Sequence, residues 1–365
     1  MNTFICQHCN QAVFFDNSQC ESCGAALGFD SDQLQMISLT QAHETQTLLD
    51  KKSNPYRACA NRALHVCNWL LPKASLDTDL YCRACALNRY VPNTGDADAS
   101  VQWAELEQAK KRLMYSLIRF GLPVVAKKDG QQQGLRFDFI DQQQNIPQNA
   151  TNTIGHSQGQ ITITTDEANP SEREQTRIDL GEKYRTLLGH FRHEIGHYYW
   201  DHLVANDAHW LQEFRKLFGD DRQDYQQALA SHYQNPNPNW RMDFISEYAS
   251  AHPWEDWAET WAHYFHLIDT VDTALHFGIQ IRPNNAELPK TTYSLRDGAS
   301  ADAYSSENFQ ELYDNYIPIT LAVNSLNRSL GQSDVYPFVL NQSVFKKLDF
   351  IHQLIKNKSN TATPD

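Results

Sequence analysis

His193-Glu194-Ile195-Gly196-His197 is the stretch of sequence around which the rest of the chain is organised. It reads H-E-x-x-H inside residues 184–204, a proline-free run whose apolar residues recur near the helical period. Residues four apart share one face of a helix, so both imidazoles can reach one metal ion, with Glu194 placed beside them to take a proton from a metal-bound water. Such groups are costly to bury without a partner, which favours a metal site over core histidines.

Bulk composition narrows the class of protein. The chain has 365 residues and a net charge of -13, which argues against binding to nucleic acid or to an anionic membrane surface. No signal-peptide pattern and no apolar run of membrane-spanning length is present, so we expect a cytoplasmic protein. All eight cysteines lie at or before Cys85, and a cysteine cluster in that compartment indicates metal binding rather than disulfides.

The first cysteine set has the spacing of a zinc ribbon. Cys6 and Cys9 form one C-x2-C pair, and Cys20 and Cys23 form a second. Four thiolates close the coordination of one tetrahedral zinc ion, so this site is expected to be structural. A redox role for one pair is less favoured because the pairs come as a matched set.

The second cysteine set is less regular. It comprises Cys59, Cys67, Cys82 and Cys85, and only the last two have C-x2-C spacing. These residues form either a second structural zinc site or free buried thiols. Acidic residues balance the basic ones through residue 91, so we expect this cysteine-rich module to contact a protein partner rather than nucleic acid.

The third ligand of a catalytic zinc must come from elsewhere in the chain. The extended pattern H-E-x-x-H-x-x-G-x-x-H fails, because Leu203 stands where a third histidine would be and His202 is one position off. A second predicted helix begins at Pro253, and its Glu255 and Glu259 share one face. Glu255 can reach the metal, and Glu259 can accept a hydrogen bond from a ligand histidine. The alternative is a solvated helix start whose acidic residues favour the helix dipole.

HEIGHYYW at 193–200, followed by EDWAETWAHYF at 255–265, resembles the bacterial zinc-binding metallopeptidases that carry an N-terminal zinc-ribbon domain. The helix with E-x-x-A-E is more distantly similar to that of gluzincin peptidases such as anthrax lethal factor and the Mlc titration factor peptidases. The lethal-factor pattern implies Glu255 as the third ligand and Tyr248 as a tyrosine that stabilises the transition state. The 57 residues between His197 and Glu255 leave the choice between Glu255 and Glu259 open.

The resemblance implies an α+β fold: a mostly helical, gluzincin-like zincin domain with a small sheet, preceded by the zinc-ribbon domain. The polar stretch at 92–100 is the predicted boundary, which gives a cysteine-rich module at 1–92, a peptidase domain at 100–356 and a flexible tail at 357–365. Strands are expected at 135–140 and 159–165. Residues 161–164 are either an edge strand that pairs with a peptide or an ordinary sheet strand.

The leading hypothesis is a zinc-dependent peptidase that acts on peptides or proteins, with Glu194 as general base and Tyr248 as oxyanion donor. It predicts one catalytic zinc and one or two structural zinc ions per chain. The alternative is a non-catalytic scaffold or protein-binding module that zinc stabilises.

Overall fold

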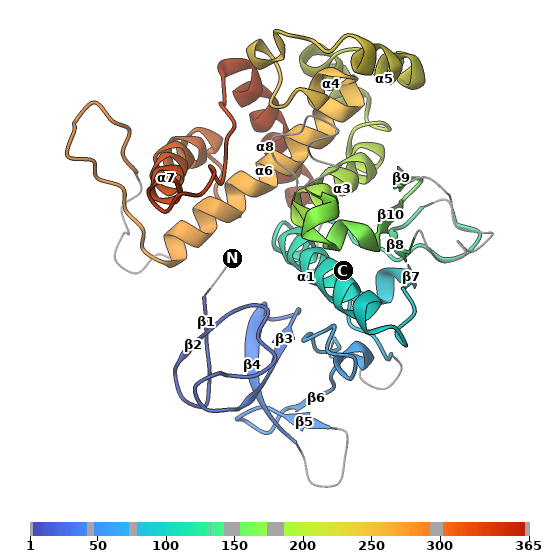
Figure 1. Cartoon of the computed structure of the whole chain (residues 1–365), viewed down its shortest axis with the longest axis vertical. Coiled ribbons are helices and arrows are strands. Elements are labelled where there is room, and N and C mark those ends of the chain that lie inside the picture. Colours follow the sequence, from blue (N-terminus) through green and yellow to red (C-terminus); the bar gives the residue numbers. More distant parts are fainter. Residues whose placement is uncertain are drawn as a thin grey trace. The chain divides into compact units, whose positions relative to one another are not determined.

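The computed structural model describes residues 3–41, 47–72, 79–131, 133–141, 154–173, 186–292 and 302–361. The chain forms two compact units, Met1–Ile118 with Pro123–Glu172 and Arg119–Leu122 with Arg173–Asp365. The strands lie in the first unit together with one long helix, and the other described α-helices lie in the second (Figure 1). The predicted α+β class is confirmed.

The first unit starts with short antiparallel strands that carry the cysteine knuckles. β1 (Phe4–Ile5) pairs with β2 (Ala12–Val13) as a hairpin. A four-stranded antiparallel sheet follows in the order β3 (Ala26–Asp30), β4 (Gln35–Gln41), β5 (Leu48–Leu49) and β6 (Pro55–Tyr56). Its core is built from the buried side chains of Ile37, Leu39, Tyr56 and Leu70.

A second sheet of this unit has the order β7-β8-β10-β9, where β7 is Asn88–Tyr90, β8 is Arg136–Ile140, β9 is Gly155–Ser157 and β10 is Gln160–Thr164. β10 pairs in parallel with β8 on one side and antiparallel with β9 on the other. Of the two alternatives for residues 161–164, the free edge is excluded at Ile161 and Thr162, because β9 already pairs with them there. The run of β-branched residues predicted the strand, but edge position depends on a hairpin partner that the pattern does not reveal.

Helix α1 (Ala97–Arg119) belongs with this sheet up to Ile118. Its Lys110 is fully buried, donates to Glu107 at 2.7 Å, and lies over the rings of Phe137 and Phe139. A buried ammonium is stable there because it has both a carboxylate partner and aromatic faces. The sequence led us to place residues 100–118 and 123–172 in the peptidase domain, whereas the structure packs them in the first unit. The domain boundary at 92–100 stays a prediction.

The second unit is built on α3 (Leu187–Leu203) and α6 (Pro253–His276), which pack against each other (Figure 1). Thr186 caps α3 by accepting from the Gly189 amide at 3.0 Å, and His252 caps α6 by accepting from the Trp254 amide at 3.0 Å. A Cβ on Gly196 would lie 3.1 Å from the Cα of Ala258. The glycine inside the H-E-x-x-H motif therefore allows a close approach of the two helices.

The remaining helices of this unit are α4 (Ala208–Phe218), α5 (Tyr225–Gln234), α7 (Phe309–Ser329) and α8 (Gln342–Thr361), with short 3-10 turns η5 (Trp240–Met242) and η6 (Tyr248–Ser250). α8 continues to Thr361, whereas a tail was expected from residue 357; no proline or glycine interrupts the helix before Pro364, and residues 362–365 lie outside the described part. Within the described residues, no helix is long and apolar enough to cross a membrane.

Candidate metal centre

Three side chains from α3 and α6 converge in the second unit. The Nε2 atoms of His193 and His197 lie 3.3 Å apart. Glu255 places its Oε2 atom 3.0 Å from the first nitrogen and 3.6 Å from the second. The two histidines are one turn apart on α3, and Glu255 lies in the first turn of α6, so the helix packing brings the three together.

These distances can be tested against zinc. Ligands at about 2.0–2.1 Å from a tetrahedral ion are separated from one another by about 3.3 Å, and the three observed separations bracket this value. Glu255 Oε2 is buried, and no donor in the described residues is oriented to hydrogen-bond to it. Two imidazoles and a carboxylate oxygen that face one point in this way fit a zinc ion that keeps an open position.

Glu259 lies one turn after Glu255 and contacts the other side of an imidazole. Its Oε1 atom is 2.7 Å from Nδ1 of His193, and its Oε2 atom accepts a hydrogen bond of 2.6 Å from Ser246. A carboxylate at Nδ1 holds the proton there and leaves Nε2 as the ligand atom. The geometry therefore favours Glu255 as ligand and Glu259 as the group that orients His193.

Glu194 is buried beside the two histidines and pairs with His190 at 3.1 Å. Burial raises the pKa of Glu194, but the hydrogen bond and charge of His190, with the charges of His193 and His197, outweigh burial and lower the pKa to about 2. The carboxylate is thus ionised, which is the form that accepts a proton.

Two tyrosines and a tryptophan border the cluster. Tyr225, the first residue of α5, donates a hydrogen bond of 2.6 Å to Oε1 of Glu255. The ring of Tyr248 lies 6.0 Å from the ring of His193, and the Trp254 ring lies 4.1 Å from that of His197. Burial and the charge of Glu255 raise the pKa of Tyr248, which keeps its hydroxyl protonated as a donor.

Both cysteine sets of the first unit also converge. The sulfur atoms of Cys6 and Cys23 are 3.8 Å apart, and those of Cys9 and Cys20 are 3.7 Å apart. Zinc–sulfur bonds of about 2.3 Å predict separations of about 3.8 Å on a tetrahedron. In the second set, Cys67 and Cys82 are 3.7 Å apart, and Cys59 and Cys85 complete a buried group of four. The geometry of each set fits a closed structural zinc site.

Comparison with known families agrees with this geometry. Residues 99–354 match the family described as "Putative zinc-binding metallo-peptidase", and residues 3–96 match a zinc-ribbon domain. The chain belongs to this zinc-binding metallopeptidase family. The resemblance stated from the two motifs is thereby confirmed, whereas the more distant similarity to gluzincins stays a prediction.

Relatives from two mycobacteria match nearly the whole chain. Uncharacterized proteins of Mycobacterium tuberculosis and Mycobacterium bovis are each 38% identical over 357 residues, which cover 97% of this chain and 95% of theirs. No solved structure shows a significant match. The family membership thus rests on sequence, and the site geometry on the structure described here.

Two polar residues of α3 and α6 lie outside the ligand cluster. His202 lies at the end of α3 with its Nδ1 atom 2.9 Å from the carbonyl oxygen of Tyr198, and it is not one of the clustered ligands. Asp256 is fully buried against Lys347 of α8 at 2.6 Å. Burial raises the pKa of Asp256, and Lys347 limits the rise, to about 7.

Three contacts of the site were missed from sequence: His190 to Glu194, Ser246 to Glu259 and Tyr225 to Glu255. The i,i+4 spacing could have revealed His190, since it lies one turn before Glu194 on the same helix. Tyr225 and Ser246 carry no local signal, because their partners lie 30 and 13 residues away along the chain.

Proposed function

We propose that the chain is a zinc-dependent peptidase in which His193, His197 and Glu255 hold the catalytic metal. The observation that carries the proposal is the convergence of these three ligand atoms beside Glu194, which is ionised and buried. A closed structural site has no use for such a base, whereas hydrolysis of an amide needs one. When bound, zinc would act as a Lewis acid that activates water and polarises the scissile carbonyl.

The chain's own residues divide the remaining work. Glu194 accepts a proton from the attacking water and delivers it to the leaving amine. Glu259, itself held by Ser246, keeps the His193 ring in one orientation and one tautomer. Tyr248 is the proposed donor to the oxyanion that develops on the scissile carbonyl, where a preorganised hydroxyl acts with little reorganisation.

The test is peptide-library cleavage by the wild-type chain beside Glu194→Gln, with zinc content and thermal stability measured on both. The variant keeps the size of the side chain and removes the base without touching a ligand. Hydrolysis should fall by about 10²–10⁴-fold while zinc is retained.

Two outcomes would count against this mechanism. Undiminished cleavage by Glu194→Gln at full zinc loading would remove Glu194 from the reaction. Absence of cleavage by the zinc-loaded wild type across the library would favour the scaffold hypothesis.

A further inference from the structure

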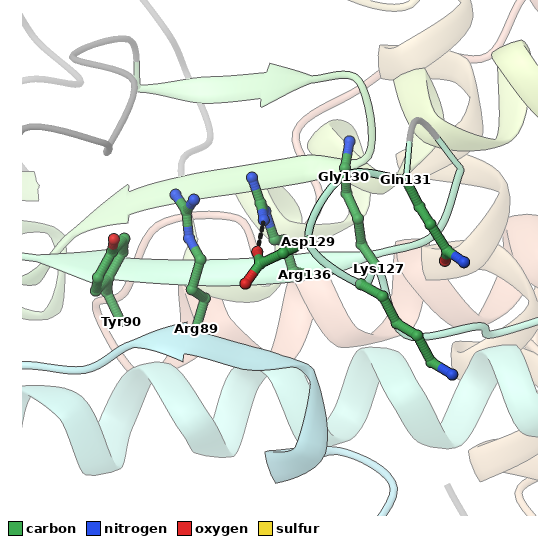
Figure 2. Close-up of a pocket in the computed structure, with 8 residues that line it drawn as sticks. Arg89, Tyr90, Lys127, Asp129, Gly130, Gln131 and Arg136 are labelled. Carbon is green, nitrogen blue, oxygen red and sulfur yellow. Dashed lines mark hydrogen bonds and ion pairs between the residues drawn. The ribbon is translucent and has the colours of Figure 1, made fainter.

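The first unit contains a recess whose lining is unusually basic for an acidic chain. It has a volume of about 430 Å³ and is formed by β7, the start of β8 and residues 127–131 of the turn before β8 (Figure 2). We call it the basic recess, and it is lined by Arg89, Tyr90, Lys127, Lys128, Asp129, Gly130, Gln131 and Arg136. None of these residues belongs to the metal centre or to a cysteine set.

The charges of the lining do not balance. Arg89 forms a two-bond pair with the buried Asp138, so its charge is compensated. Three further lining residues are cationic: Arg136, Lys128, and Lys127, whose ammonium donates to the carbonyl oxygen of Gln158. The lining itself contains one carboxylate, that of Asp129. The recess is therefore a positive concavity on a chain whose net charge is -13.

Arg136 is held in place mainly by a neutral side chain, that of Gln160. Its Nη2 and Nε atoms donate to Oε1 of Gln160 at 2.8 and 3.1 Å, and Gln160 in turn donates to Thr162 at 3.4 Å. The arginine side chain is 17% exposed, so its guanidinium is fixed and largely desolvated against a neutral amide. A planar, immobile guanidinium is well suited to bind an oxyanion.

The carboxylate of Asp129 is a weak competitor for this cation. It lies 3.3 Å from Nη1 of Arg136, the ion pair drawn as a dashed line in Figure 2. The Asp129 side chain is 98% exposed. Exposed ion pairs contribute little, so an incoming anion can displace it. Burial, with the charges of Arg136 and Arg89, lowers the pKa of Lys127.

We propose that the basic recess binds an oxyanion, either free phosphate or the carboxylate of a peptide end, with Arg136 as the central contact and Lys127 and Lys128 as flanking cations. The volume suits a small ligand or the end of a chain rather than a folded surface. This assignment does not depend on the proposed peptidase activity.

Calorimetric titration of the full zinc-loaded chain at low ionic strength tests the proposal. The probes are inorganic phosphate, trialanine with a free carboxylate, and trialanine amide. Saturable binding of phosphate or of the free acid, but not of the amide, is expected, and the comparison of the two acids identifies the source of the oxyanion. If neither inorganic phosphate nor trialanine with a free carboxylate bound, the proposal would be overturned.

Two variants that are expected to change the binding affinity in opposite directions locate the site. Arg136→Gln should abolish binding, whereas Asp129→Asn should tighten it by about fivefold, since a like charge about 4 Å away is removed. Lys128→Gln, at an exposed position, should weaken binding several-fold and serves if Arg136→Gln does not fold. Arg222→Gln removes an exposed arginine of the second unit and should leave binding unchanged.

The metal centre could bind the same anions, and the variants separate the two sites. Binding that survives both Arg136→Gln and Lys128→Gln, or that is insensitive to Asp129→Asn, would place the anion outside the basic recess and overturn the proposal.

Discussion

Glu255 illustrates how surroundings set the chemistry of one residue. Its carboxylate is almost completely buried, with one oxygen bound by Tyr225 and the other directed at two imidazoles. Burial raises the pKa of Glu255, but the adjacent His197 and His193 more than compensate, so its pKa lies well below the usual range. A buried carboxylate is stable only with such partners, and a bound cation would complete them.

The first residue-scale prediction separates the two glutamates of α6. Glu255→Ala should abolish cleavage and lower zinc occupancy of the histidine site, because it removes a ligand atom. Glu259→Ala should lower affinity or activity by about 10–100-fold, as for a group that orients a ligand. Zinc analysis and peptide cleavage measure both effects.

Glu247→Ala is the control for this pair, since it removes an exposed carboxylate from the segment just before α6. Equal or reversed effects of Glu255→Ala and Glu259→Ala would show that the ligand assignment is off by one helical turn.

The second residue-scale prediction concerns Tyr225. Tyr225→Phe removes the donor to Oε1 of Glu255, so the carboxylate is less firmly oriented toward the histidines. We expect zinc to dissociate about 10–100-fold faster into a chelator, a change independent of peptide cleavage. Tyr313→Phe, whose hydroxyl donates to the Leu340 carbonyl away from the site, should have no such effect. Unchanged zinc release from Tyr225→Phe would reduce this tyrosine to a packing role.

At the scale of elements, the site depends on how closely α3 and α6 approach. Gly196 lies against the backbone of Ala258 and the Cβ of Trp261, and its carbonyl accepts a 2.8 Å hydrogen bond from Nε1 of Trp257. The same two helices carry all three candidate ligands. The spacing between α3 and α6 therefore controls whether Glu255 reaches the histidines.

Gly196→Ala tests this dependence. Overpacking costs about 1–3 kcal/mol, and the better helix propensity of alanine offsets about 1 kcal/mol of it. We expect a net loss of about 1 kcal/mol in the free energy of unfolding together with weaker zinc retention, measured by denaturant titration and chelator competition.

Ser231→Ala, at an exposed position of α5, changes helix propensity alone and is the matched control. A Gly196→Ala variant that is more stable and retains zinc normally would mean that the helices can separate without disturbing the ligands.

The elements were predictable to different degrees. Helical periodicity and the Pro253 start gave α3 and α6, because both helices bury an apolar stripe that the sequence shows directly. The strand β10 was also visible, but its partners were not. Strand neighbours are chosen by pairing between distant segments, and local pattern contains no record of that choice.

For the whole molecule, the three ligand clusters predict its metal content. Elemental analysis of the purified chain should give about three zinc ions, or about two if the Cys59 set is empty. A value near one would contradict either the ribbon assignment or the catalytic one.

The order in which the three sites lose zinc is also predictable. A site with three protein ligands and an open position exchanges more readily than one closed by four thiolates. Mild chelation should therefore remove cleavage activity before it lowers the cysteine-bound zinc, and readdition of zinc should restore it.

The sequence alone determined the chemistry that needs short-range spacing: the histidine pair with Glu194, both C-x2-C pairs of the ribbon, and the two glutamates one turn apart. These follow from fixed helix and turn geometry, which residue order specifies directly. Tertiary structure decided the rest. Only helix packing places Glu255 rather than Glu259 against both Nε2 atoms and brings Tyr225 to it across 30 residues. Likewise, only the fold of β7, β8 and the turn before β8 gathers Arg89 and Arg136 with Lys127 and Lys128 in one recess. Those contacts join separate elements, and their distances depend on side-chain packing that no local pattern encodes.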